Sequence, residues 1–320
     1  MEKNFLLEKG KKIFPKFFLL KRELSLPKME INISYNDNRI LTNKIGFNKK
    51  RKIRNPGIDF VRILSMYVII IHHILLFGKV IKKYRNYKEL IFLNISCFWH
   101  VNSYALISGY IGHKSNKYSN LIYLWICVLF YSVGITYFFE KYISQKSTVK
   151  INFVYYFPVN FNIYWYFTKY FGMYQFLPVI NKGIEYLTKK ELRIVFISLI
   201  LVYVILKDII NPGGKDIYTM HSGYSVVWLL ILYLTGVYFG KFNKEYKGIK
   251  KIVLIIIYIF VFYFSTYLCF YFSNYPLSNS MESFKMKIII ILKYLLSRRI
   301  NSLPMILQSI SITLLLTQIK

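Results

Sequence analysis

The chain has 320 residues, of which 55% are hydrophobic and 19% aromatic, and its 44 Lys and Arg residues against 14 Asp and Glu give a net charge of +30. A soluble globular domain does not need so large an apolar fraction, so we expect an integral membrane protein. The basic residues separate the apolar segments instead of gathering on one polar domain, which favours loops at anionic lipid surfaces over nucleic-acid binding.

Residues 1–57 form a polar, strongly basic arm to which we assign no fold. The run NKKRKIR at 48–54 lies directly before the first apolar segment, where positive charge holds a terminus in the cytoplasm. We therefore expect a cytoplasmic arm over 1–57 and a transmembrane domain over 58–320.

A helix needs about 20 apolar residues to cross roughly 30 Å of hydrocarbon, and by that measure the chain holds about eight spans. The expected fold is all-α, a polytopic bundle in the cell membrane with both termini cytoplasmic, although the basic loop 79–89 on the external side weakens this orientation. The segment KMKIIIILK at 285–293 is too short to span and is expected to be an interfacial helix. In chain order, the expected spans are 58–78, 90–112, 119–139, 164–180, 192–206, 224–240, 252–272 and 301–319.

The first span carries four ionisable side chains in an otherwise apolar helix. Placing a charge in hydrocarbon costs at least roughly 2.5–3.5 kcal/mol on insertion scales, so we expect these groups to face protein or a wet cavity. Asp59 and Arg62 are spaced to pair on one helix face, although such a pair is also common at the end of any membrane helix. His73 lies about three turns beyond Arg62 and returns to nearly the same face, whereas His72 is rotated by about 100° and is expected to be a bystander.

The pattern IDFVRILSMYVIIIHH resembles the first membrane helix of the acyltransferase-3 family, integral-membrane O-acyltransferases whose first span carries an acidic residue, then Arg, ten residues and His. Arg62 and His73 match that spacing. Three further stretches are similar to family segments and follow in the same order: VNSYALISGY at 101–110, YWYFTKYFGMYQFLPVIN at 164–181 and GYSVVWLLILYLTGV at 223–237. The residues that carry these likenesses are Ser108, Gly109, Pro178, Asn181, Tyr233 and Gly236.

The resemblance covers about 58–319. Members of the family usually continue with further membrane helices and a Tyr-Leu-Ile-His-like segment, which nothing after LLLTQIK supplies. On this comparison we expect a member that lacks the C-terminal helices.

The resemblance implies transfer of an acyl group, commonly acetyl from acetyl-CoA as co-substrate, to a hydroxyl of a cell-surface glycan or its lipid-linked precursor. His73 is the expected general base, and Asp59 is expected to orient Arg62. Arg62 and Lys169 are the expected contacts to the phosphates of the acyl-CoA donor. The expected substrate contacts are Ser108, Tyr110 and Trp165.

Other classes of site and function have less support in the sequence. Cys97, Cys127 and Cys269 are isolated within apolar runs, and the histidines have no metal-ligand spacing, so we expect neither a metal nor a resident cofactor. His100 is expected to be a buried hydrogen-bonding side chain. The alternatives to an active enzyme are a degenerate, non-catalytic family member and a glycan exporter, the latter without the internal repeats typical of transporters.

Overall fold

The computed structural model describes residues 55–319 except 84–86, 114–117, 145–147, 149–150, 213–214, 243–248, 275–282 and 297–298. All of them belong to one compact unit, Ile53–Lys320. The expected basic arm, apart from its last three residues, lies outside the described part of the chain.

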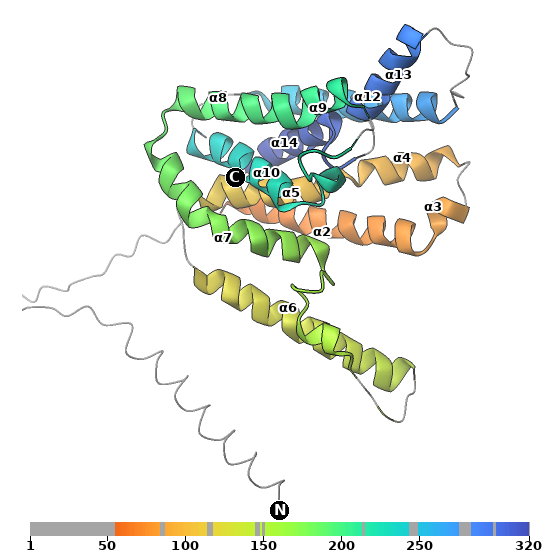
Figure 1. Cartoon of the computed structure of the whole chain (residues 1–320), viewed down its shortest axis with the longest axis vertical. Coiled ribbons are helices and arrows are strands. Elements are labelled where there is room, and N and C mark those ends of the chain that lie inside the picture. The colour runs from red at the N-terminus through yellow and green to blue at the C-terminus, as the bar shows by residue number, and fades with distance from the viewer. Residues whose placement is uncertain are drawn as a thin grey trace, which may run out of the picture. The chain divides into compact units, whose positions relative to one another are not determined.

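Every described element is a helix, which confirms the predicted all-α fold class (Figure 1). Two segments are π-helical extensions of α-helices, Phe139–Ile143 after α6 and Leu201–Leu206 after α8, and two are 3₁₀ turns, Phe153–Tyr156 and His221–Gly223. The α-helices are α2 (Pro56–Phe77), α3 (Val80–Lys83), α4 (Lys88–Ser96), α5 (Trp99–Gly112), α6 (Tyr118–Phe138), α7 (Trp165–Tyr186), α8 (Lys189–Ile200), α9 (Lys207–Ile210), α10 (Val226–Lys241), α12 (Lys251–Asn274), α13 (Ser283–Leu295) and α14 (Leu303–Thr317).

The predicted number of spans is only partly supported. Four described helical segments are long and apolar enough to cross a membrane, namely Pro56–Phe77, Lys88–Gly112, Tyr118–Ile143 and Lys251–Leu268. The apolar helices α10 and α14 are shorter, and the helices at the predicted spans 164–180 and 192–206 are not among the four. The count of about eight spans is therefore not confirmed, although a helix occupies each predicted range.

The second predicted span is interrupted. Residues 90–112 were expected to form one helix, but α4 ends at Ser96 and α5 begins at Trp99. The backbone N–H groups of Cys97 and Phe98 donate to the carbonyls of Asn94 and Ile95, three residues back, so the α-helix ends in a tight turn of 3₁₀ type. This break places His100 in the first turn of α5.

Among the described helices, α5 and α10 make the most extensive contact. A Cβ atom at Gly109 would lie 1.9 Å from the carbonyl oxygen of Tyr233, and one at Gly236 would lie 2.0 Å from that of Leu106. Only glycine permits this approach, which is the usual way in which membrane helices gain packing energy. Gly109 and Gly236, which carry two of the likenesses to the family, therefore lie at this close contact.

Buried polar side chains join the helices around this crossing. The Asn102 side chain donates from Nδ2 to the Ile300 carbonyl at 2.8 Å and accepts at Oδ1 from Trp228 Nε1 at 3.1 Å. The Arg299 guanidinium lies 2.7 Å from the buried Asp208 carboxylate, which ties α9 to the segment before α14. These contacts fix the start of α14 against α5 and α10.

Candidate functional site

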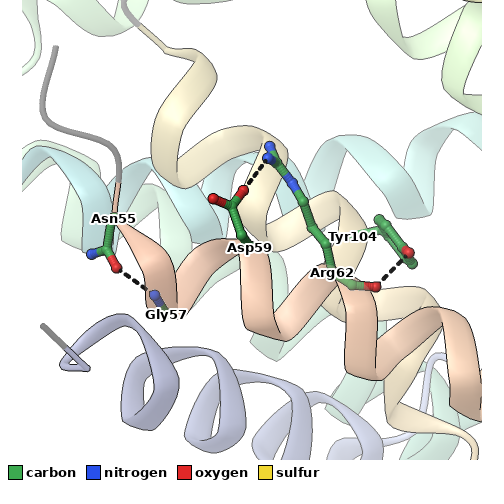
Figure 2. Close-up of polar contacts among 5 residues, drawn as sticks. All are labelled: Asn55, Gly57, Asp59, Arg62 and Tyr104. Atoms are coloured by element: carbon green, nitrogen blue, oxygen red, sulfur yellow. Dashed lines mark hydrogen bonds and ion pairs between the residues drawn. The ribbon is translucent and has the colours of Figure 1, made fainter. Parts of the chain in front are cut away.

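The site is built on α2, whose first turn is held in place by a cap. The Asn55 side chain accepts from the Gly57 N–H at 2.9 Å, as Figure 2 shows, and Pro56 occupies the first helical position. The same Asn55 amide donates to the Thr317 carbonyl at the end of α14, at 3.0 Å. The start of α2 is therefore fixed against α14, only a few residues before Asp59.

Asp59 and Arg62 pair on α2, as their spacing predicts. Arg62 Nη1 lies 3.3 Å from Asp59 Oδ1, with side-chain exposures of 47% and 24% (Figure 2). An exposed pair of this kind contributes only about 0–1 kcal/mol to stability. The fold therefore does not depend on the guanidinium, which is accessible to an anionic ligand.

Tyr104 connects the Arg62 turn to α5. Its hydroxyl donates to the Arg62 carbonyl at 2.8 Å, so the two helices are joined at this residue (Figure 2). One turn further along α5, the Ser108 hydroxyl donates to the Tyr104 carbonyl at 2.9 Å. The structure thus brings Ser108 into the neighbourhood of Asp59 and Arg62.

An aromatic cluster on α7 extends from Tyr104. The Tyr166 ring lies 6.2 Å from that of Tyr104 and 5.5 Å from that of Trp165, measured between ring centroids. Trp165 also packs edge-on against Tyr224 at 4.4 Å. The predicted substrate contact Trp165 is therefore linked to the Arg62 region through two aromatic rings.

The remaining predicted contacts are Tyr110 on α5 and Lys169 on α7. Tyr110 packs against the apolar cluster of Ile58, Val61 and Leu316 between α2, α5 and α14. Lys169 is half-buried on α7, and it takes part in none of the ion pairs found among the described residues.

His73 lies on the same exposed side of α2 as Arg62. Met66 and Ile70, at the helical positions between them, are 52% and 49% exposed. The His73 side chain is exposed as well, and its ring lies 5.3 Å from that of Phe77. Arg62 and His73 therefore share a face, about 16 Å apart along the helix axis, which the described residues do not bury.

A buried histidine pair on the other side of α2 was missed in the sequence. His72 and His100 are 5% and 3% exposed, and their ring centroids lie 5.4 Å apart, nearly edge-on. The signal was available, because Val61 and Ser65, both buried, define a helix face on which position 72 also falls. His100 is a buried hydrogen-bonding residue as expected, since its Nδ1 bonds the Cys97 carbonyl. Among the described residues, no three His, Cys, Asp or Glu side chains gather closely enough to hold a metal ion.

Two residues from separate stretches of the family-like pattern meet in the core. The Tyr233 hydroxyl on α10 donates to Asn181 Oδ1 on α7 at 2.7 Å, and both side chains are buried. The chain segments around 164–181 and 223–237 are therefore joined by a specific polar contact as well as by packing.

Comparison with known proteins agrees with this geometry. A family model described as an acyltransferase domain matches residues 55–319, which is well over half of the chain. No curated protein and no solved structure matches the chain. The matched range begins at the residue that caps α2 and ends just after α14, so it includes every helix described above. The chain therefore belongs to the acyltransferase-3 family of membrane acyltransferases.

Proposed function

We propose that this protein transfers an acyl group, most simply acetyl, from acyl-CoA to a hydroxyl of a cell-surface glycan or its lipid-linked precursor. The observation that carries the proposal is the Asp59–Arg62 pair on α2, which shares one exposed helix face with His73 in a chain of this family. The face presents a cation for a phosphorylated donor and a base for a hydroxyl acceptor.

Arg62 is the proposed contact to the donor. A guanidinium binds phosphate oxygens through two parallel hydrogen bonds, and the donor carries several phosphates. Asp59 orients the guanidinium, and Tyr104 fixes the backbone at Arg62. Lys169 on the half-buried side of α7 is proposed to supply a second positive charge.

His73 is proposed to act on the acceptor. Its imidazole removes the hydroxyl proton as the oxygen attacks the thioester carbonyl carbon, and the carbon–sulfur bond then breaks. The proton passes to the departing CoA sulfur, which leaves as the thiol. Ser108, Tyr110 and Trp165 are proposed to contact the substrate, since an aromatic ring such as Trp165 offers a flat apolar face to a sugar.

The two ends of α2 suit substrates that arrive from opposite sides. We place both termini in the cytoplasm of a cell membrane because positive charge precedes α2. Arg62 then lies near the cytoplasmic end, where acyl-CoA is made, and His73 lies towards the outer half. Membrane lipids are the proposed partners that surround the helix bundle.

The proposal is tested by deleting and restoring the protein in the producing cell. Loss of O-acetyl groups from the surface glycan, with normal glycan export, is the expected result, and re-expression of the full chain restores them. Loss of the glycan itself from the surface would instead indicate an exporter. An unchanged acetyl content with unchanged export would indicate a non-catalytic member.

A further inference from the structure

The His72–His100 pair occupies an apolar setting between α2 and α5. The Phe98 ring is a further neighbour of His72, and the centroids of these two rings lie 4.9 Å apart. His72 Nε2 is buried and has no hydrogen-bond partner among the described residues. A buried polar atom without a partner lowers stability, and an apolar residue of similar size would avoid this cost.

The hydrogen bond of His100 defines what its other ring nitrogen can do. The Cys97 carbonyl oxygen can only accept, so the proton of a neutral His100 must lie on Nδ1. Nε2 of the same ring is then a hydrogen-bond acceptor. The break between α4 and α5, which supplies the Cys97 carbonyl, therefore fixes one tautomer of His100.

The two rings together are suited to a hydroxylated ligand. His100 Nε2 needs a donor, and the unpartnered Nε2 of His72 needs a donor or an acceptor according to its tautomer. A hydroxyl group can both donate and accept, so a pair of neighbouring hydroxyls satisfies either arrangement. The Phe98 ring adds an apolar surface of the kind on which a sugar ring packs.

We propose that His72 and His100 form the binding subsite for the acceptor, in which two neighbouring sugar hydroxyls bond the two imidazoles. This inference rests on the function proposed above, and it places the acceptor at the same end of α2 as His73. Phe98, whose ring packs on His72, is only half-buried at the turn between α4 and α5. His72 and His100 bind and position the acceptor.

The test uses the full chain in lipid nanodiscs with two independent measurements. The first is the melting temperature with and without glycerol, cellotetraose or chitotetraose, which reports sugar binding without any reaction. The second is the use of radiolabelled acetyl-CoA, separated into hydrolysis without sugar and transfer to each sugar. The variants are His72→Leu, His100→Leu and the hydrogen-bonding replacements His72→Gln and His100→Gln.

Ser65→Ala provides the matched control. Ser65 lies on the same buried face of α2 as His72 and also has a hydroxyl without a partner among the described residues. It is about two turns away from His72, outside the proposed subsite. Its replacement is expected to leave both measurements unchanged.

We expect His72→Leu to melt at or above the wild-type temperature and to lose stabilisation by sugar. Its KM for the sugar should rise about tenfold or more, while hydrolysis of acetyl-CoA stays within about twofold, because only acceptor binding is lost. His72→Gln should recover part of the sugar affinity. The subsite would be overturned if both leucine variants had the wild-type KM for the sugar. It would also be overturned if the melting temperature, acetyl-CoA hydrolysis and acetyl transfer to sugar all fell together.

The two proposals fail separately. If the wild type is stabilised by sugar in a His72-dependent way but never transfers acetyl, the subsite stands and the acyltransferase function fails. If the wild type transfers acetyl and the leucine variants do so equally well, only the subsite fails. If sugar neither binds nor reacts, both are wrong.

Discussion

At Arg62, the side chain and the backbone have separate tasks. The guanidinium is half-exposed in its pair with Asp59, while the carbonyl is tied to Tyr104 on α5. The backbone bond positions the residue, and the weak ion pair leaves the side chain available to a ligand. A role in donor binding therefore predicts a change in affinity with little change in stability.

We expect Arg62→Ala to raise the KM for acetyl-CoA by about tenfold or more, because phosphate contacts to guanidinium are charge-assisted. Arg62→Lys should restore only part of this affinity, because an ammonium group cannot form the bidentate contact. Initial rates at varied acetyl-CoA provide the measurement, and thermal unfolding should move little. Met66→Ala, one turn further on the same exposed face, is the control. An unchanged donor KM in Arg62→Ala would remove Arg62 from the donor site.

At the scale of the helices, stability depends on the α5–α10 crossing. We expect Gly236→Ala to lower the free energy of unfolding by about 1–3 kcal/mol, since its Cβ would lie 2.0 Å from the Leu106 carbonyl oxygen and the helices would have to separate. Gly134→Ala on α6 is the matched control, because no other atom lies within 4 Å of the added Cβ. That change should be neutral or stabilising, since alanine is a better helix former. If Gly236→Ala and Gly134→Ala changed thermal unfolding equally, the claim that stability depends on the α5–α10 crossing would be wrong.

The start of α8 provides a pH-dependent contribution to stability. The Thr188 N–H and hydroxyl donate to the Glu191 carboxylate at 2.7 and 2.8 Å, and these bonds hold the pKa of Glu191 below its ordinary value. The capping box therefore stabilises α8 above the unfolded-state pKa of glutamate, about 4.3, and this contribution is lost as the pH falls through the lower folded-state pKa.

The prediction for α8 concerns the difference in melting temperature between the wild type and Thr188→Ala, which should shrink as the pH falls. Thr188→Ala should melt below the wild type at pH 7, and the gap should narrow as the pH falls below about 4. Melting curves at a series of pH values measure this gap. A gap that stays constant over the whole range would show that the Glu191 carboxylate contributes nothing.

Local spacing predicted the elements and contacts that a single helix determines. The Asp59–Arg62 pair follows from a separation of three residues, and helices occupy the predicted apolar ranges. The contacts between helices could not be predicted from local spacing. The pairing of His72 with His100 depends on how α2 and α5 are rotated against each other, which the spacing of residues within α2 does not reveal.

The span count is not confirmed, and the break after α4 was missed, for a related reason. A length rule treats every apolar run as a crossing, but α10 and α14 are shorter than the rule requires and owe part of their burial to neighbouring helices. The turn at Cys97 and Phe98 has neither Pro nor Gly to mark it in the sequence.

For the whole molecule, the proposed orientation places α2 with its first turn inside. A cysteine replacing Lys88, the first residue of α4, should then react with a membrane-impermeant maleimide added to intact cells, because α2 carries the chain to the outside. A cysteine replacing Lys251, at the start of α12, should react only after the cells are opened. Each is introduced after the native cysteines have been changed to alanine. The reverse pattern of labelling would invert the membrane orientation and with it the side from which each substrate arrives.

The central claim is that the exposed face of α2 carries out acyl transfer with His73 as the base. Its most direct test is the rate of acetyl transfer from acetyl-CoA by His73→Ala, compared with Ile70→Ala on the same face. We predict that kcat falls by about 100-fold or more in His73→Ala, with little change in the KM for acetyl-CoA, and that Ile70→Ala behaves as the wild type. A folded His73→Ala protein that transfers acetyl at the wild-type rate would contradict the account.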